Sequence, residues 1–111
     1  MASDATPELC LVYVTAPTFD VAAGLAEAMV ESRLAACANI LPGMTSIYHW
    51  QGKIERASEC VLILKTRKSL VPRLTEGLIA AHPYETPCVL AIDVAAGARA
   101  YMDWLYSEAS A

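Results

Sequence analysis

The sequence predicts an α+β fold of the ferredoxin-like type, in which an antiparallel sheet carries two helices on one face. Apolar runs and helical periodicities alternate in the order β-α-β-β-α-β, and a C-terminal helix follows. The chain has 111 residues, the size of one domain. Its hydrophobic fraction is 56%, against about 45–50% in typical domains. The order of the elements and the chain length predict the fold class, and the high hydrophobic fraction indicates that the domain has a partner.

The excess of apolar residues predicts an obligate oligomer, because a small monomer rarely exposes large apolar patches. No apolar run approaches the roughly 18 residues that a membrane span requires. A net charge of −4 disfavours nucleic acid and anionic membranes as partners. Residues 1–8 lack the basic segment of a signal peptide. We therefore expect a flexible tail at 1–8, one domain over 9–111 and a cytoplasmic location.

The four cysteines are expected to be reduced thiols buried in strands. Cys10, Cys37, Cys60 and Cys88 lie within or beside apolar runs, and no two of them form a C-x-x-C pair. A structural zinc site is therefore not expected.

The first strand and the first helix have the clearest patterns. Residues 9–15 form an apolar, β-rich run, and residues 18–33 follow a helical period. Thr18 can cap the helix start. Polar or small residues fall on one helical face and apolar residues on the other: Asp20, Gly24, Glu27 and Glu31 against Val21, Leu25, Ala28 and Met29.

The middle of the chain predicts a long hairpin. Strands are expected over 36–41 and 45–50, with a bulge or kink at Pro42-Gly43 on an exposed edge. A two-residue turn at Gln51-Gly52 leads to a return strand over 53–66. This turn pairs Trp50 with Lys53, Tyr48 with Glu55, His49 with Ile54 and Ile47 with Arg56. The aromatic tip favours a role in assembly over a ligand platform.

The remaining elements complete the fold. A second helix over 69–81 is expected to be capped by Ser69, with Pro72 in its first turn and Val71, Leu74 and Leu78 as its apolar stripe. A strand over 87–94 and a helix over 97–107 follow. Both helices of the βαβ units cover one face of the sheet, so the other face is expected to need a second copy.

The segment AAHPYETP carries the candidate chemistry. His82 is expected to end the second helix, and metal binding by it is the alternative. Pro83 and Pro87 stiffen the segment and hold Tyr84 and Glu85 in place. No G-x-S-x-G, Walker-type or G-x-G-x-x-G pattern is present. Hydrolase or isomerase chemistry by His82 and Glu85 is conceivable, but no motif supports it.

Four stretches together resemble the CutA family of divalent-cation tolerance proteins. The first stretch begins with VTAPTFDVAAG and ends with YHWQGKIE, and the other three are ECVLILKT, HPYETPCVLAI and YMDWL. The resemblance implies a ferredoxin-like homotrimer, similar to the trimeric PII signalling proteins and built by pairing long hairpins. It also implies a non-enzymatic role in tolerance of copper and other divalent cations, by binding or signalling.

The resemblance also implies site residues. Some bacterial members place a cysteine before Thr-Ala-Pro and two histidines before Pro-Tyr. Here Val14 and Ala81 stand at those positions, and only His82 remains of that copper set. We expect at most weak copper(II) binding. The residues assigned to a cleft between subunits are Tyr48, Trp50, Lys65, Tyr84 and Glu85. The alternative function is a PII-like sensor of a small metabolite in that cleft.

Overall fold

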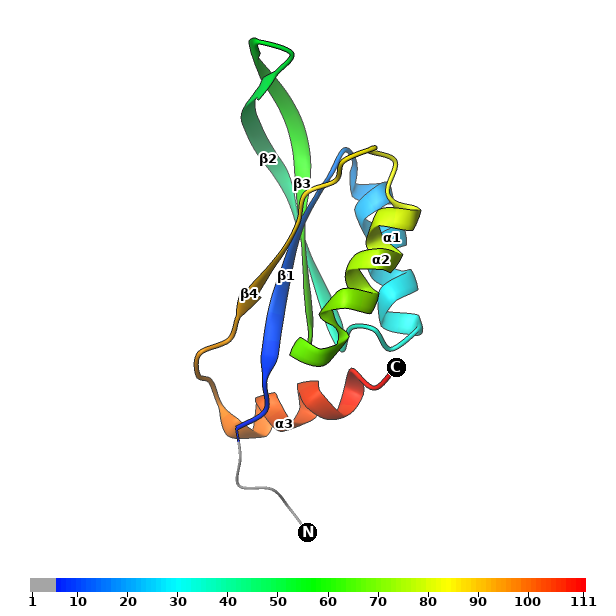
Figure 1. Ribbon diagram of the computed structural model, residues 1–111, viewed down its shortest axis with the longest axis vertical. Helices are drawn as coiled ribbons and strands as arrows, with labels where there is room; N and C mark the ends of the chain where they lie inside the picture. Colours follow the sequence, from blue (N-terminus) through cyan, green and yellow to red (C-terminus); the bar gives the residue numbers. More distant parts are fainter. Residues whose placement is uncertain (1–5) are drawn as a thin grey trace.

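The computed structural model describes residues 6–111, so the first five residues of the predicted tail lie outside the described range. Its elements are β1 (Leu9–Ala16), α1 (Phe19–Glu31), β2 (Cys37–Trp50), β3 (Lys53–Arg67), a short 3-10 turn (Lys68–Leu70), α2 (Val71–Ala81), β4 (Val89–Asp93) and α3 (Arg99–Glu108). This order confirms the predicted β-α-β-β-α-β arrangement with a C-terminal helix. The molecule is elongated, measuring 55 × 25 × 22 Å, because the β2–β3 hairpin projects far beyond the helices (Figure 1).

The sheet has the strand order β2-β3-β1-β4, and all neighbouring strands are antiparallel. Helices α1 and α2 lie side by side against one face, and α3 crosses the lower end of the sheet (Figure 1). Strand β3 lies between β2 and β1, which confirms that the apolar run CVLIL belongs to a central strand. Strands β2 and β4 form the two edges.

The core lies between the sheet and the two helices. Val12, Val14, Leu62 and Leu64 of the sheet are fully buried there against Leu74 and Leu78 of α2. Burial of each such side chain stabilises the fold by about 1.5–3 kcal/mol. Thr18 caps α1 as predicted, because its hydroxyl accepts a hydrogen bond from the Val21 N–H at 3.2 Å. Ala28, predicted on the buried face of α1, is exposed, and Ala22 and Ala26 are buried instead.

The hairpin has the predicted register. Trp50 pairs with Lys53 and Tyr48 with Glu55, and the turn residues Gln51 and Gly52 have positive φ angles of 48° and 78°. A register shift between Leu41 and Met44 confirms the bulge expected at Pro42-Gly43. Gly43 has a φ of 79°, which favours glycine at this point.

Three predicted element starts were wrong, those of α2, β4 and α3, and α3 begins at Arg99 rather than at residue 97. Ser69 does not cap α2, because a 3-10 turn precedes the helix and the residue at the cap position is Leu70, which has no side-chain cap bond. Pro72 does lie in the first turn of α2, as predicted. Strand β4 begins at Val89 rather than at residue 87, because Pro87 has no N–H to donate to a ladder.

Candidate functional site

The loop from α2 to β4 is held in place by His82. The backbone N–H of His82 donates to the Leu78 carbonyl at 2.9 Å and ends α2, as predicted. Its imidazole is buried, with 8% exposure. The ring Nδ1 accepts a hydrogen bond from the Tyr84 N–H at 3.1 Å, so Nε2 carries the proton and donates to the Thr15 carbonyl at 2.8 Å. His82 therefore ties this loop to the end of β1.

These contacts bear on the metal site predicted at His82. Both ring nitrogens bond to backbone groups, so a metal ion must displace one of these bonds to reach the imidazole. Within residues 6–111 no group of three or more His, Cys, Asp or Glu side chains is placed to hold a metal ion. The donor set of one chain does not fit a resident metal centre.

A polar cluster lies next to His82, where the projecting hairpin leaves the sheet. The Tyr84 hydroxyl donates to Glu59 Oε2 at 2.9 Å, and the Tyr84 ring is 4.7 Å from the His82 ring. Burial, together with the hydrogen bond to Glu59 and the charge of that carboxylate, raises the pKa of Tyr84 to about 12. Burial and the Glu59 charge also raise the pKa of the Cys88 thiol. We call Glu59, His82, Tyr84 and Cys88 the junction cluster.

The structure brings only part of the predicted cleft together. Tyr48 lies near Tyr84, whereas Trp50 lies at the hairpin tip. Lys65 is at the far end of β3, where its Nζ donates to the Tyr101 hydroxyl at 3.0 Å and lies 5.2 Å from that ring's centroid. Glu85 is exposed. Within one chain, then, Tyr48 lies near Tyr84, whereas Trp50 and Lys65 lie in other regions, and the cleft between subunits stays a prediction.

Nothing in the sequence pointed to two of the residues that make these contacts, Glu59 and Tyr101. Glu59 precedes the apolar run CVLIL and looks like an ordinary strand end. Its position becomes clear only from the bulge, because the register shift pairs Glu59 with Met44 rather than with Pro42 or Gly43. Tyr101 is 36 residues from Lys65, and no local spacing connects them. Only the crossing of α3 under the sheet brings them into contact.

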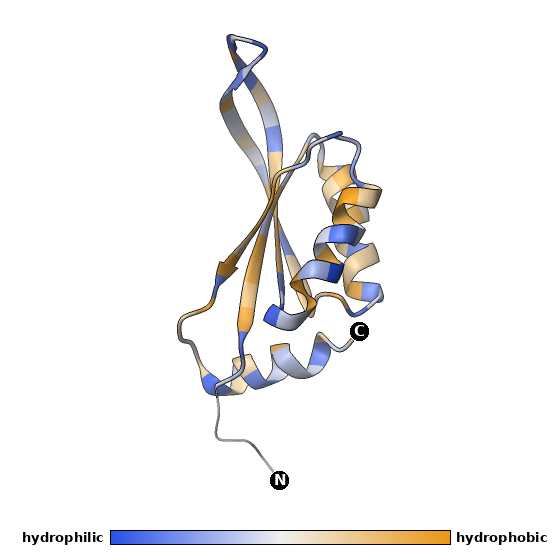
Figure 2. Ribbon diagram, in the orientation of Figure 1, coloured by the Kyte–Doolittle hydropathy of each residue, from blue (hydrophilic) through white to orange (hydrophobic). Residues whose placement is uncertain are grey.

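The sheet face opposite α1 and α2 is apolar and exposed. Residues directly opposite each other share a face, so Tyr13 lies with Leu90 and Ile63, and Leu11 lies with Ile92. Leu90 is 61% exposed and Ile92 is 53% exposed. We call this surface the open face. Figure 2 shows its strands as strongly hydrophobic below the hairpin, in β1 and β4.

The projecting hairpin, residues 44–59, carries further exposed apolar side chains. Ile47, Trp50 and Ile54 are 61%, 59% and 63% exposed. No helix covers this part of either strand (Figure 1). We call residues 44–59 the arm.

The thiols and carboxylates of the described chain are not arranged as an activated nucleophile. Cys10 and Cys60 are buried as predicted, while Cys37 and Cys88 are half-buried, and all four are free. Burial and a 3.4 Å contact with Asp93 raise the pKa of Cys10, which disfavours the thiolate. Lys68 and Cys10 hold the pKa of Asp93 below its usual value. This group links β1 to β4 and the 3-10 turn.

A family model described as CutA1 divalent ion tolerance protein matches residues 10–108. A divalent-cation tolerance protein CutA of Thermus thermophilus is 47% identical over 95 residues, which cover 86% of this chain and 92% of that protein. A protein CutA of Mus musculus is 49% identical over 94 residues, covering 85% of this chain and 53% of that protein. This chain thus spans about half the length of the mouse relative.

The fold agrees with the solved structures as well. A structure of the divalent cation tolerance protein (Cut A1) from Thermus thermophilus superimposes with a TM-score of 0.88 at 45% identity, covering 90% of this chain and 97% of that chain. The CutA1 structure from Oryza sativa superimposes with a TM-score of 0.90 at 41% identity, covering 93% and 94%. No helix among residues 6–111 is long and apolar enough to cross a membrane.

Proposed function

The chain belongs to the CutA1 divalent ion tolerance family, and from that premise we propose that it acts in the tolerance of divalent metal ions as a homotrimer. It acts by binding or signalling rather than by catalysis. The family's name describes tolerance and no reaction, and burial raises the pKa of the Cys10 and Cys88 thiols, which disfavours a nucleophilic thiolate at these two positions. The proposed compartment is the cytoplasm.

The observation that carries the trimer is the exposed apolar surface of the open face and the arm. Leu90 and Ile92 on β4, and Ile47 and Ile54 on the arm, are each more than half exposed. Each such side chain gains about 1.5–3 kcal/mol when it is fully buried. A second and a third copy provide that burial, which a monomer cannot.

The backbone supports the same assembly. Strands β2 and β4 are the two edges of the sheet, so each has one side whose N–H and C=O groups do not pair within the sheet. In the arm, β2 and β3 pair only with each other. An isolated two-stranded hairpin is marginally stable in water. When the arm of one copy pairs with an edge strand of the next, the free backbone groups of the edge form hydrogen bonds and the arm is stabilised.

Metal ions enter this proposal indirectly. Copper(II) is the divalent cation we propose for the response, and His82 is the residue that the sequence offers for it. Because its two nitrogens hold the loop against β1, we propose weak copper binding, with the response transmitted by the trimer rather than by a tight metal centre.

A calorimetric titration with copper(II) tests this proposal. The protein is titrated beside His82→Asn and beside His49→Ala, which removes the exposed imidazole of the arm. Light scattering in the same buffer establishes the oligomer. We expect weak binding that His82→Asn leaves unchanged. Saturable binding at a fixed ratio per chain, abolished by His82→Asn alone, contradicts the indirect role and makes His82 a metal ligand.

A PII-like sensor of a small metabolite is the second candidate, and the junction cluster favours it. Tyr84 and Glu59 present a phenol and a carboxylate beside the open face, and Tyr48 of the arm lies nearby. A ligand that binds only the native state raises the melting temperature. A metabolite that does so for the protein and not for Tyr84→Phe supports the sensor. A panel of nucleotides and organic acids without effect counts against it.

A further inference from the structure

Glu59 is a carboxylate without a cationic partner at the base of the arm. It is half-buried, and its Oε2 accepts the hydrogen bond from the Tyr84 hydroxyl at 2.9 Å. None of the ion pairs found between residues 6 and 111 includes it. A half-buried carboxylate gains from a nearby cation, because it has lost part of its hydration. The described part of one chain therefore leaves the charge of Glu59 uncompensated.

A second carboxylate of the sheet, Asp93, shows what compensation looks like. Asp93 lies 3.4 Å from the Cys10 sulfur and forms an ion pair with Lys68 at 3.3 Å. Burial and Asp93 raise the pKa of the Cys10 thiol, and the positive charge of Lys68 opposes them. Burial, the hydrogen bond to Glu59 and the charge of Glu59 raise the pKa of Tyr84, and within the described chain no lysine or arginine charge opposes them. The junction cluster is therefore negative, whereas the group around Asp93 is neutralised.

The two cations of the arm lie away from Glu59. Arg56 is an odd number of positions from Glu59 in β3, so the two side chains point to opposite faces of the strand. Lys53 shares the face of Glu59 but lies at the turn, where it pairs with Trp50. Along an extended strand the distance from Lys53 to Glu59 is about 20 Å. The arm of one chain therefore supplies no counter-ion to its own base.

The groups around Glu59 suit an organic cation better than a metal ion. Backbone groups engage both nitrogens of His82, and burial raises the pKa of the Cys88 thiol, so neither side chain is a ready metal donor. The carboxylate lies instead beside aromatic side chains. The Tyr84 ring is 36% exposed and lies 4.7 Å from the His82 ring, and Tyr48 is nearby. The face of an aromatic ring attracts an ammonium group.

Glu59 and Tyr84 also have hydrogen-bond acceptors to spare. The Tyr84 hydroxyl gives its one proton to Glu59, so its oxygen can only accept a further hydrogen bond. An ionised carboxylate accepts up to about four hydrogen bonds. A primary ammonium group has three N–H donors and no acceptor, so its hydrogen bonding complements this pair as well as its charge does.

We propose that Glu59 and Tyr84 bind the primary ammonium group of a small organic amine at the base of the arm. The ammonium group donates to the carboxylate of Glu59 and to the phenolic oxygen of Tyr84. This inference rests on the second candidate function, a sensor of a small metabolite at the junction cluster, and it names the chemical class of that metabolite.

The test is an NMR titration of the intact protein with four small molecules at low ionic strength, because salt screens exposed charges. The probe is propylammonium. Among the controls, 1-propanol removes the charge, propionate reverses it, and tetramethylammonium keeps it without any N–H donor. Each is added to the unchanged protein and to Glu59→Gln, Tyr84→Phe and Glu27→Gln. Glu27→Gln removes one exposed negative charge from α1 and so matches Glu59→Gln in chemistry and net charge. Light scattering establishes the oligomer of every variant.

The expected result is saturable binding of propylammonium with shifts at the amides of Glu59 and Tyr84, weaker binding of tetramethylammonium, and no saturable shift from 1-propanol or propionate. Glu59→Gln raises the dissociation constant roughly tenfold or more, because it removes the charge that the ammonium group pairs with. Tyr84→Phe raises it about threefold, because one neutral acceptor is lost. Glu27→Gln leaves it unchanged.

The proposal is overturned if propylammonium causes no saturable shift at these amides, if tetramethylammonium binds as tightly, or if Glu59→Gln binds the amine in full. A Glu59→Gln protein that loses its oligomer, together with no amine binding to the unchanged protein, also overturns it and assigns Glu59 to a contact between copies. A nucleotide or organic acid that stabilises the protein but not Tyr84→Phe then keeps the sensor without the amine. If no ligand of any class does so, the sensor fails as well.

Discussion

The β2–β3 hairpin has two halves that are built from the same two strands and are stabilised in different ways. Below the bulge, Leu62 and Leu64 of β3 are fully buried under α1 and α2. In the arm, Ile54 of β3 and Ile47 of β2 are more than 60% exposed. The lower half is therefore covered by the chain itself, whereas the arm is left exposed, and we propose that other copies cover it. One strand can belong both to a protomer core and to an assembly surface.

The bulge marks the border between the two halves. Pro42 and Gly43 interrupt the register between Leu41 and Met44, and the first pair beyond it is Met44 with Glu59. Glu59 also accepts the hydrogen bond from Tyr84. The loop that His82 anchors therefore contacts the hairpin at the point where the helices no longer cover it.

The largest expected effect lies in the lower half. Leu64→Ala leaves a cavity beneath the helices and lowers the free energy of unfolding by about 2–5 kcal/mol. Urea denaturation at fixed protein concentration measures it. Ile79→Ala, on the outer surface of α2, where the side chain is 49% exposed, serves as the control for truncating an apolar side chain. An equal cost for the two substitutions contradicts the burial of Leu64 under the helices.

The next effect separates assembly from folding. Ile54→Asp places a charge on a surface that the proposed trimer buries, and we expect at least tenfold weaker association, about 1.4 kcal/mol or more. Light scattering measures the oligomer, and far-ultraviolet circular dichroism is expected to show the fold retained. Glu27→Lys on the outer face of α1 is the control and leaves the mass unchanged. A fully assembled Ile54→Asp protein argues against a buried arm.

A smaller effect is expected at the turn that closes the arm. Gly52 has a φ of 78°, so Gly52→Ala costs about 1–2 kcal/mol of stability. Gln51 also has a positive φ, of 48°, and Gln51→Asn is expected to be neutral or stabilising, because asparagine tolerates this conformation better. Thermal denaturation is expected to show a lower melting temperature for Gly52→Ala than for Gln51→Asn. Equal melting temperatures contradict a strained two-residue turn.

The smallest effect lies at the border and depends on pH. The pKa of Tyr84 is raised to about 12, so the folded protein holds the phenolic proton more tightly than the unfolded chain. The stability from this group is complete below about pH 10 and is lost as the pH rises toward 12. Urea midpoints at pH 9 and pH 11 should fall less for Tyr84→Phe than for the unchanged protein. An equal fall shows that Tyr84 is not linked to stability.

The sequence predicted local structure well and distant contacts poorly. The hairpin register was correct because the Gln51-Gly52 turn and the alternation of residues beside it determine each pair. The Ser69 cap was wrong because Leu70 enters the core and is nearly buried, which local propensity does not show. The Tyr84–Glu59 and Lys65–Tyr101 contacts join residues 25 and 36 positions apart, so only the folded chain reveals them.

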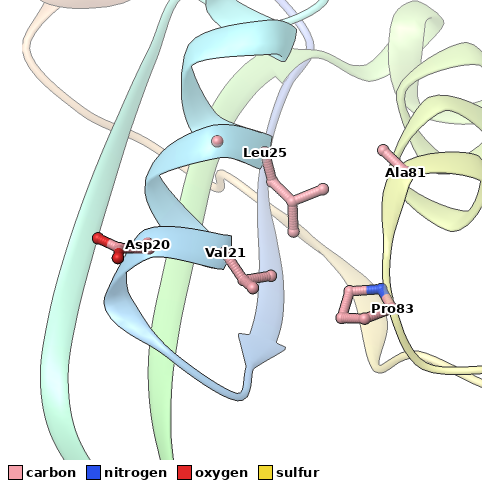
Figure 3. Close-up of a pocket in the computed structure, with 6 residues that line it drawn as sticks. Asp20, Val21, Leu25, Ala81 and Pro83 are labelled. Atoms are coloured by element: carbon pink, nitrogen blue, oxygen red, sulfur yellow. The ribbon is translucent and has the colours of Figure 1, made fainter.

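The pocket between α1 and the end of α2 (Figure 3) was hidden for a similar reason. The helical period placed Val21 and Leu25 on one face of α1, but nothing in the pattern shows that Ala81 and Pro83 lie beside that face. Helix packing, and the loop that His82 holds, create the second wall. Site geometry therefore depends on the order of layers, whereas the elements themselves depend on local pattern.

The central claim is that other copies of this chain cover the arm and the open face. Light scattering on the intact protein at micromolar concentration tests it most directly. The account predicts a single species of three times the chain mass of 11.9 kDa. A single species at 11.9 kDa, with Leu90, Ile92 and the arm exposed in solution, contradicts it.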